Sequence, residues 1–349
     1  MSHIPEESNT FADCLLGWYD ENGRSFVFRG TKDPYRVWLS EIMLQQTRTE
    51  SAGPYYERFL SRFPDVAALA AADEESVLCC WQGLGYYTRA RNLHKAAKMV
   101  VSDFGGAFPR TAEALRTLPG VGAYTAAAVA SIAFGECVPS MDGNLIRVFS
   151  RLTDEAEDAS QPATVQRLAE EAKRLMPQDR PGDYNQALMD LGATVCTPGT
   201  PDCSACPIQA YCLAAQAGHP ETRPVLPRKA PPICVPLNLL MIFGHGRVYL
   251  RQRREALLKG MYVFALSEDP PEQALNALGL TGAEIVPAGE ARHVFTHRVW
   301  EMTLWAVHID HIPPALEPNF YTPEQMDALP VPTAMRAACA YVRKELHQS

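Results

Sequence analysis

Residues 118–144 read LPGVGAYTAAAVASIAFGECVPSMDGN and combine a glycine turn, an alanine-rich run and an acidic residue. The two glycines of the turn can adopt positive φ, and the run Ala123–Phe134 favours a helix, which Gly135 is expected to end. Free N–H groups and the positive end of the helix dipole would converge at the turn, which suits a phosphate oxygen. The segment predicts an acidic residue, Asp142, one short helix away from a phosphate-binding turn. A plain helix-turn-helix corner with Asp142 as N-cap is the alternative.

Length and composition describe a chain with room for two domains. The 349 residues include ten cysteines, and the polar start of the sequence shows no apolar leader. No run approaches the roughly 18 apolar residues of a membrane span. These features predict a cytoplasmic protein that keeps its thiols reduced or binds a metal.

The distribution of charge singles out the same part of the chain. The formal net charge is −8, which by itself disfavours a nucleic-acid partner. Residues 81–151, however, hold eight basic and four acidic side chains, whereas residues 1–80 hold seven basic and thirteen acidic ones. The glycine turn thus lies in the basic segment of an acidic protein.

A second candidate site residue lies in a predicted helix that begins at Asp33-Pro34 and runs to about Thr47. Within it, Val37, Glu41 and Leu44 fall on one face, so the carboxylate of Glu41 lies on an apolar row. Such a carboxylate is either held in a structural ion pair or desolvated, and desolvation raises its pKa.

An aromatic segment follows at residues 81–93, WQGLGYYTRARNL. Its glycines allow close backbone approach, its tyrosines could stack in an opened duplex, and its arginines could bind phosphates. A buried aromatic turn between two helices is the alternative. Further helices are predicted at 93–104 and 111–118, with no strand-like alternation before residue 230, so the first part of the chain is expected to be all-α.

Three of these segments resemble one known family. LPGVG followed by an alanine-rich helix and an Asp resembles the helix-hairpin-helix element of the endonuclease III-like DNA glycosylases. Ser40–Thr47, SEIMLQQT, and the WQGLGYYTRARNL segment resemble the corresponding motifs of the MutY-type adenine DNA glycosylases. The resemblance implies an all-α helix-hairpin-helix glycosylase domain with an iron–sulfur cluster loop.

Four cysteines in the pattern C-x6-C-x2-C-x5-C are candidate metal ligands: Cys196, Cys203, Cys206 and Cys212. Four thiolates suit a structural Zn²⁺ as well as a [4Fe–4S] cluster. The spacing matches the cluster loop of the same family, which favours the [4Fe–4S] cluster. The other six cysteines show no ligand spacing and are interpreted as core thiols.

A proline-rich segment, 218–236, is predicted to be an extended linker between a domain at 1–217 and a second domain at 237–349. Strands are predicted at 237–243, 248–251, 261–266 and 299–308, and helices near 270–279, 323–329 and 333–347. This α+β domain resembles the Nudix-like C-terminal domain of the same family, which reads the oxidised guanine opposite the target base. Phe295-Thr296-His297 resembles its F-S-H recognition loop, with Thr in place of Ser.

The resemblance implies a role for each candidate residue. Glu41 would be the general acid that protonates adenine, and Asp142, supported by Asn144, would stabilise or trap the cationic sugar. Tyr124 stands where the lyase-type relatives carry a Schiff-base lysine, which implies a purely hydrolytic enzyme. Duplex DNA with adenine opposite 8-oxoguanine or guanine would be the partner of a monomeric protein, with a monovalent cation as a further expectation at the hairpin. The expected DNA contacts are Arg29, Gln46, Tyr86, Arg89, Arg91, Gly120, Gly122, Phe295, Thr296 and His297.

Three other functions are alternatives to this one. A glycosylase-lyase on the same fold would need the missing lysine. A Nudix pyrophosphatase would need an acidic metal-binding helix, but residues 270–279 contain only Glu272. A non-catalytic iron–sulfur sensor of DNA damage would leave both carboxylates dispensable.

Overall fold

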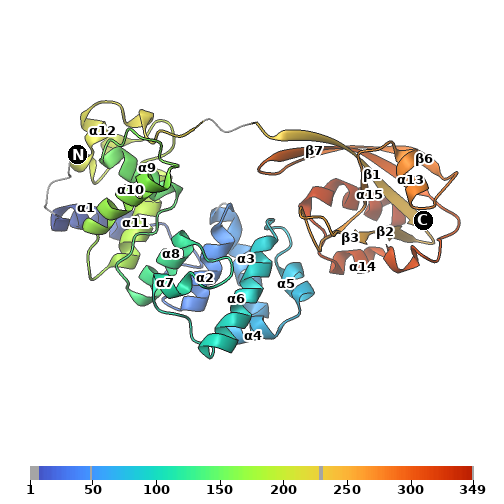
Figure 1. Cartoon of the computed structure of the whole chain (residues 1–349), viewed down its shortest axis with the longest axis horizontal. Helices are drawn as coiled ribbons and strands as arrows, with labels where there is room; N and C mark the ends of the chain where they lie inside the picture. Colours follow the sequence, from blue (N-terminus) through green and yellow to red (C-terminus); the bar gives the residue numbers. More distant parts are fainter. Residues whose placement is uncertain (1–7, 48, 228–230, 348–349) are drawn as a thin grey trace. The chain divides into compact units, whose positions relative to one another are not determined.

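The computed structural model describes residues 8–47, 49–227 and 231–347. The chain divides into two compact units, one formed by residues up to Ala72 together with Asn92–Arg228, the other by Asp73–Arg91 together with Lys229 onward. Figure 1 shows the helices and strands of the two units.

The described part of the first unit consists of helices, which confirms the all-α prediction. Its main helices are α1 (Ser8–Asn22), α2 (Pro34–Leu44), α3 (Thr49–Arg62), α4 (Val66–Ala71), α6 (Thr88–Phe104, whose first turn belongs to the second unit), α7 (Ala112–Leu115), α8 (Ala123–Phe134), α9 (Gly143–Leu152), α10 (Pro162–Arg174), α11 (Pro181–Thr194) and α12 (Leu213–Gln216). Short 3₁₀ turns at Cys203–Ala205, Gln209–Tyr211 and Pro220–Thr222 complete the unit.

The hairpin between α7 and α8 follows the sequence prediction closely. Helix α8 spans Ala123–Phe134 and ends at Gly135, whose φ of 74° is left-handed. At the turn, Gly120 has a φ of 77°. Gly122 differs from expectation, because it is the N-cap of α8 with extended backbone, φ −84° and ψ 178°. Only one of the two glycines therefore needs its conformational freedom.

The predicted start of α2 is also confirmed, but the helix is shorter than expected. Asp33 is the N-cap and accepts a hydrogen bond from the backbone N–H of Tyr35. The helix ends at Leu44 because Gln45 leaves the helical region, with ψ of 113°. The last residues of the predicted helix, up to Thr47, thus form a turn beside the pocket described below.

One core joins the N-terminal helix to the later helices of this unit. Phe11 and Leu15 of α1 pack with Phe149 of α9 and with Tyr184 and Leu188 of α11, all fully buried. The core continues into the cysteine loop, where Ile208 and Cys212 are buried. Helices α1 and α11 and the cysteine loop therefore share one core, in which the ring of Phe11 also meets that of Tyr211 edge-on at 5.5 Å.

The second unit contains a mixed sheet of six strands in the order β6-β7-β1-β2-β8, with β5 also paired to β1. The strands are β1 (Ile233–Gly244), β2 (Arg247–Tyr249), β5 (Ala265–Ser267), β6 (Glu284–Val294), β7 (Arg298–His308) and β8 (Phe320–Tyr321), with β3 (Arg251–Gln252) and β4 (Tyr262–Val263) as a separate pair. The helices are α5 (Glu74–Cys80), α13 (Pro271–Ala277), α14 (Pro323–Ala328) and α15 (Arg336–His347). Strands β1 and β7 run parallel, and β6 and β7 are antiparallel.

Alternating residues of β1 face two different cores. Leu239 and Met241 pack in one core with Val342 of α15. Leu240 and Ile242 pack in another with Leu275 of α13. Because successive side chains of a strand point to opposite faces, α13 and α15 cover opposite faces of the sheet.

Three features of the second unit were not predicted. Strand β6 was missed because all eleven of its residues are at least partly exposed, so no alternation of buried and exposed positions marks it, and a bulge between Pro287 and Gly289 interrupts its register. Strand β1 begins at Ile233, inside the predicted linker. The segment 73–91 also clusters with this unit, through hydrogen bonds such as Gln82 Nε2 to the carbonyl of Val331 at 3.1 Å.

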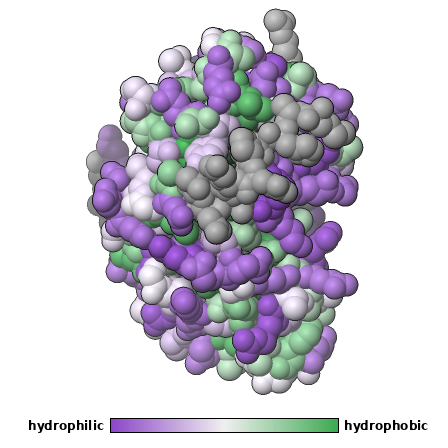
Figure 2. Space-filling view, turned by 90° about the vertical axis from the view of Figure 1, so that its left-hand side faces the viewer, coloured by the Kyte–Doolittle hydropathy of each residue, from purple (hydrophilic) through white to green (hydrophobic). Residues whose placement is uncertain are grey.

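No helix in the described ranges is long and apolar enough to cross a membrane. The face shown in Figure 2 is mostly hydrophilic, with smaller hydrophobic groups between the polar side chains.

Candidate active site

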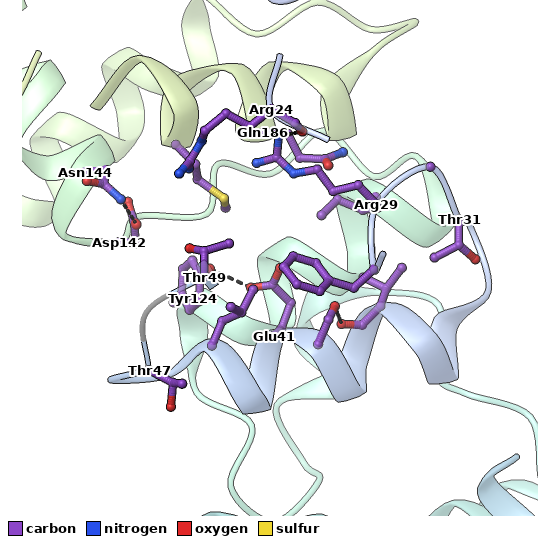
Figure 3. A pocket seen from close by; sticks show the side chains of 17 residues that line it. Arg24, Arg29, Thr31, Glu41, Thr47, Thr49, Tyr124, Asp142, Asn144 and Gln186 are labelled. Atoms are coloured by element: carbon purple, nitrogen blue, oxygen red, sulfur yellow. Dashed lines mark hydrogen bonds between the residues drawn. The ribbon is translucent and has the colours of Figure 1, made fainter. Parts of the chain in front are cut away.

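A pocket of about 240 Å³ opens in the first unit among α2, α8, α9, α11 and the segment before α2 (Figure 3). It brings together residues that are up to about 160 positions apart in the sequence. Its lining includes four residues predicted to act in catalysis, together with Arg29: Glu41, Tyr124, Asp142 and Asn144. Gln186 and Met189 of α11 also line it and were not predicted.

Glu41 is buried on α2, with 7% of its surface exposed. The hydroxyl of Tyr124 on α8 donates a hydrogen bond of 2.6 Å to its Oε2 (Figure 3). Burial raises the pKa of Glu41 to about 7, the negative charge of Asp142 acts in the same direction, and the Tyr124 bond opposes both. Of the two alternatives for Glu41, a structural ion pair or a desolvated carboxyl group, the structure therefore favours the desolvated carboxyl group.

Asp142 is the N-cap of α9 and also lines the pocket. Its Oδ1 accepts a hydrogen bond of 2.7 Å from the backbone N–H of Leu145, and its Oδ2 accepts one of 2.8 Å from the side-chain amide of Asn144. Burial raises the pKa of Asp142, and these hydrogen bonds act against the rise because they favour the ionised form. Asp142 was expected to be either a plain N-cap or an acidic site residue. It is an N-cap that also lines the pocket, so the two alternatives coincide.

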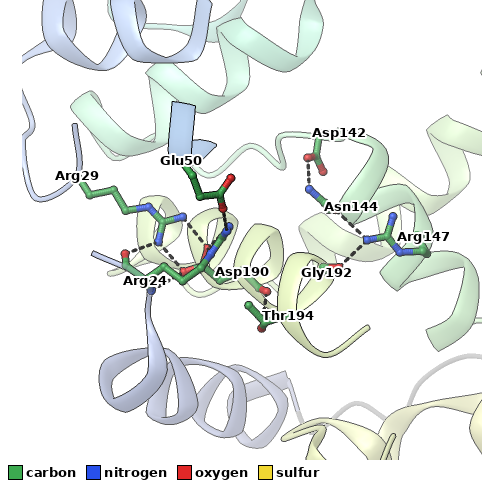
Figure 4. Close-up of polar contacts among 9 residues, drawn as sticks. All are labelled: Arg24, Arg29, Glu50, Asp142, Asn144, Arg147, Asp190, Gly192 and Thr194. Carbon is green, nitrogen blue, oxygen red and sulfur yellow. Dashed lines mark hydrogen bonds and ion pairs between the residues drawn. The ribbon is translucent and has the colours of Figure 1, made fainter. Parts of the chain in front are cut away.

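Asn144 is held by Arg147, one turn further along α9 (Figure 4). The Nη2 of Arg147 donates to Asn144 Oδ1 at 2.8 Å and to the carbonyl of Gly192 at 2.6 Å. Its Nε donates to the carbonyl of Cys196 at 2.7 Å. A continuous set of hydrogen bonds thus runs from the cysteine loop to the carboxylate of Asp142.

Arg29 is fixed in the pocket wall by a buried ion pair that sequence reasoning missed. Asp190 on α11 has no exposed side-chain surface and accepts two hydrogen bonds from Arg29, at 2.5 and 2.8 Å (Figure 4). The Nε of Arg24 also donates to Asp190 Oδ1, at 2.8 Å. The pairing holds the pKa of Asp190 below its usual range although burial acts in the opposite direction. A partner 161 positions away leaves no local pattern from which this contact could have been predicted.

The four predicted cysteine ligands lie in one loop after α11, and their charges influence one another. Burial, followed by smaller contributions from the neighbouring thiols, raises the pKa of Cys206 to about 12. The buried Arg151 donates from Nη1 to Cys196 Sγ at 3.2 Å, which places a positive charge beside the loop. Within the described ranges, no group of three or more His, Cys, Asp or Glu side chains is arranged to hold a single metal ion.

Two of the predicted DNA contacts have an unusual backbone. Gln46 in the turn after α2 has a φ of 58°, and Tyr86 in the second unit has a φ of 47°. The left-handed region is costly for residues other than glycine, and such strain concentrates at functional sites. Both side chains are exposed.

The predicted arginine contacts at Arg89 and Arg91 are bonded to protein groups in the second unit. Arg89 Nη2 donates to the carbonyls of Leu84 and Gly85, at 3.1 and 3.2 Å, and its guanidinium lies over the rings of Trp81 and Tyr86. Arg91 pairs with Glu74 at 2.9 Å. In this structure both arginines shape the aromatic segment, and their role as DNA contacts stays a prediction.

The Phe295-Thr296-His297 loop forms the turn between β6 and β7. Phe295 packs edge-on against Trp300, with ring centroids 4.9 Å apart, while Thr296 and His297 are exposed. The hydroxyls of Thr296 and Tyr86 are 3.0 Å apart and hydrogen-bonded. The second unit therefore brings together two residues that were both predicted to contact DNA.

Comparisons with known proteins give both units a family. Residues 39–174 match the model of the HhH-GPD superfamily base excision DNA repair proteins, and residues 238–341 match the NUDIX domain model. The chain is 35% identical to the adenine DNA glycosylase of Mus musculus, over 93% of this chain and 76% of that protein. It is 40% identical to the adenine DNA glycosylase of Mycolicibacterium smegmatis, over 59% of this chain and 70% of that protein.

The extent of the similarity differs among the other relatives. The human adenine DNA glycosylase is 45% identical over 62% of this chain, but the match spans 41% of that protein. Among solved structures, a thermostable thymine-DNA glycosylase has a TM-score of 0.55 at 29% identity and covers 60% of this chain and 97% of its own. An endonuclease III–DNA complex has a TM-score of 0.50 at 20% identity, with 60% and 97% covered, and shows the fold alone.

Proposed function

Because the chain belongs to the adenine DNA glycosylase family, we propose that it removes adenine from duplex DNA in which adenine is mispaired with 8-oxoguanine or guanine. The observation that carries the proposal is the pair of carboxyl groups in one pocket. Glu41 has a pKa of about 7, and Asp142 lies across the pocket with hydrogen bonds to its ionised form.

The two carboxyl groups meet the two requirements of N-glycosidic cleavage. Adenine leaves poorly as an anion, so Glu41, protonated below about pH 7, donates a proton to a nitrogen of its imidazole ring. The sugar develops positive charge as the bond breaks, and ionised Asp142 stabilises or traps that cation. The deprotonated Glu41 then accepts a proton from the attacking water. The adenine nucleotide must first leave the base stack, since the carboxyl group of Glu41 is buried within the pocket.

Tyr124 supports a hydrolytic reaction in preference to a lyase. Its hydroxyl is bonded to Glu41, and burial holds its pKa well above the usual value, so it stays neutral and donates. A Schiff base with the sugar would need a primary amine. No lysine is present among the described residues that line the pocket.

The cysteine loop fits a [4Fe–4S] cluster, which we propose as the cofactor. Four thiols lie on one loop, Arg151 donates to Cys196 Sγ, and backbone N–H groups lower the pKa of Cys206 and Cys212 against the effect of burial. Hydrogen bonds to sulfur are typical of such sites. The cluster would anchor the loop that follows α11, and cleavage of the glycosidic bond needs no electron transfer.

We assign catalysis to residues 1–217 without the segment 73–91, and recognition of the opposite base to residues 237–349 together with that segment. The predicted linker 218–236 joins them and contains the first residues of β1. Thr296 keeps the hydroxyl of the family's serine, and its hydrogen bond to Tyr86 presents two hydroxyls together. A purine oxidised at C8 offers an additional oxygen acceptor and N–H donor to such a pair. Gln46 and Tyr86 fill the base stack, and the Gly120 turn with Gly122 holds a backbone phosphate, with a monovalent cation bound there.

Single-turnover cleavage of a duplex with adenine opposite 8-oxoguanine tests the proposal. We expect Glu41→Gln and Asp142→Asn each to lower the rate constant by at least about 10²-fold, the usual contribution of such groups. Glu50→Gln is the matched control, because Glu50 lies close to the pocket with 72% of its side chain exposed. Unchanged rates in both pocket variants, or equal cleavage of thymine or cytosine in the same duplex, would refute it.

A further inference from the structure

The chain segment that delivers Asp142 to the pocket has no secondary structure of its own. Residues 135–142 lie between α8 and α9 without helix or strand pairing. Backbone polar groups in such a segment need other partners when they are buried. Ser140, two positions before Asp142, has no exposed surface.

Asn185 on α11 supplies those partners. Its Oδ1 accepts a hydrogen bond of 3.0 Å from the backbone N–H of Ser140, and its Nδ2 donates one of 3.0 Å to the carbonyl of Val138. The same Nδ2 donates at 2.8 Å to the hydroxyl of Ser131 on α8. The side chain of Asn185 is fully buried and makes three of the four hydrogen bonds an amide can form. One carboxamide therefore ties the segment to two helices.

Asp142 is held from its two sides by different elements. On the C-terminal side, the N–H of Leu145 and the amide of Asn144 bind its carboxylate. On the N-terminal side, its own N–H donates to the carbonyl of Ser140 at 2.8 Å, and Ser140 is in turn held by Asn185. The helix cap binds the carboxylate, whereas Asn185 binds the backbone two and four positions before it.

We propose that Asn185 is a positioning residue for the Asp142 carboxylate, acting through its paired hydrogen bonds to Val138 and Ser140. The inference rests on the proposed function, since Asn185 would control how well Asp142 is placed to stabilise a cationic sugar. It assigns a role in the reaction to a side chain that is absent from the residues lining the pocket. A shift of the segment by less than an ångström weakens the stabilisation of a developing charge, because that stabilisation depends on preorganised distance.

The test compares two duplexes that mimic successive states of the sugar. In one, the nucleotide opposite 8-oxoguanine is a pyrrolidine abasic analogue whose protonated ring nitrogen carries the positive charge of the cation. In the other, it is the neutral tetrahydrofuran analogue. The ratio of the two dissociation constants reports the attraction of Asp142 for positive charge, and a general loss of stability affects both constants alike.

Asn185→Leu keeps the volume of the side chain and removes its hydrogen bonds. We expect a loss of about 30-fold or more in the binding ratio and in the single-turnover rate constant, with binding of the neutral duplex within about 3-fold of wild type. Ser131→Ala is the matched control: of the three hydrogen bonds of Asn185 it removes only the one to α8 and leaves the two to the segment, and it also removes the bond from the Ser131 hydroxyl to the carbonyl of Ala128 within α8. We expect its ratio to stay within about 3-fold of wild type.

Each outcome decides the question. An unchanged ratio in Asn185→Leu, or an equal loss in Ser131→Ala, overturns the positioning role while leaving the proposed function standing. A wild-type protein that neither cleaves the adenine duplex nor prefers the cationic analogue refutes the proposed function itself. If Asn185→Leu does not fold, Asn185→Ala, whose smaller side chain leaves space for water beside Ser140, carries the same test with the same criteria.

Discussion

The raised pKa of Glu41 predicts that this side chain destabilises the folded protein in a pH-dependent way. Its pKa rises from the ordinary value of 4.5 to about 7, chiefly by burial. At about 1.4 kcal/mol per pKa unit, the ionised form costs the native state about 3 kcal/mol. Replacing Glu41 by Gln removes the ionisation and keeps an acceptor oxygen for Tyr124.

The sign follows from proton linkage. A carboxyl group whose pKa is higher in the folded state gives its full stabilisation below the unfolded pKa and loses it as pH rises through the folded pKa. Near pH 4, the ionisation of Glu41 should therefore contribute little to the difference in unfolding free energy between wild type and Glu41→Gln. Glu41→Gln should gain about 1.4 kcal/mol relative to wild type by about pH 5.5 and about 3 kcal/mol above about pH 8.

Urea unfolding, followed through the helical circular dichroism signal, measures this difference across the pH range. Glu50→Gln serves as the control, because it removes a carboxylate whose side chain is 72% exposed, and such a change should alter the free energy of unfolding by less than about 1 kcal/mol. A difference between wild type and Glu41→Gln that stays constant from about pH 5 to pH 8.5 would refute the reasoning. It would mean that Glu41 ionises in the pocket as readily as in water, and the general-acid role would lose its physical basis.

Three other variants test the surroundings of the pocket. Tyr124→Phe removes a hydrogen bond that favours ionised Glu41, so the pH at which single-turnover cleavage falls should move upward; a downward shift contradicts the assignment. Asp190→Asn leaves two arginines without their buried counter-charge and should lower the free energy of unfolding by about 3 kcal/mol or more. A loss of less than about 1 kcal/mol, measured by urea titration, would count against a buried ion pair. Gly192→Ala places a Cβ 2.7 Å from the side chain of Asn144 and should slow cleavage by about 10-fold or more. Gly17→Ala, whose Cβ lies in open space on α1, should leave the rate unchanged. Equal rates in these two variants would exclude the steric effect.

Local patterns in the sequence predicted the local features of the site. The extent of α8, the left-handed Gly135 and the Asp33 N-cap follow from propensity and capping, which act within a few residues. The burial of Glu41 followed from its place on an apolar face. Predictions of this kind succeed because the interactions that decide them lie within one or two helical turns.

The remaining features depend on contacts between distant parts of the chain. No periodicity connects Arg29 with Asp190, Ser140 with Asn185, or Gln82 with Val331, because the two residues of each pair lie far apart in the sequence. Strand β6 escaped prediction because it lies at the edge of the sheet and is exposed along most of its length, so the hydrophobic alternation of a half-buried strand is absent.

Helix α11 explains why these distant contacts belong together. Asn185, Asp190 and Gly192 lie within about two turns of this helix and hold, respectively, the segment before Asp142, the arginines of the pocket wall, and Arg147. The helix ends at Thr194, two positions before Cys196, so the cysteine loop continues directly from it. Any displacement of α11 would therefore move the supports of Asp142 and Arg29 together. Helix α11 carries neither of the two carboxyl groups proposed to act in catalysis, but it holds the supports of Asp142 and Arg29. We therefore expect substitutions on its buried face to affect the rate of cleavage more than the binding of DNA.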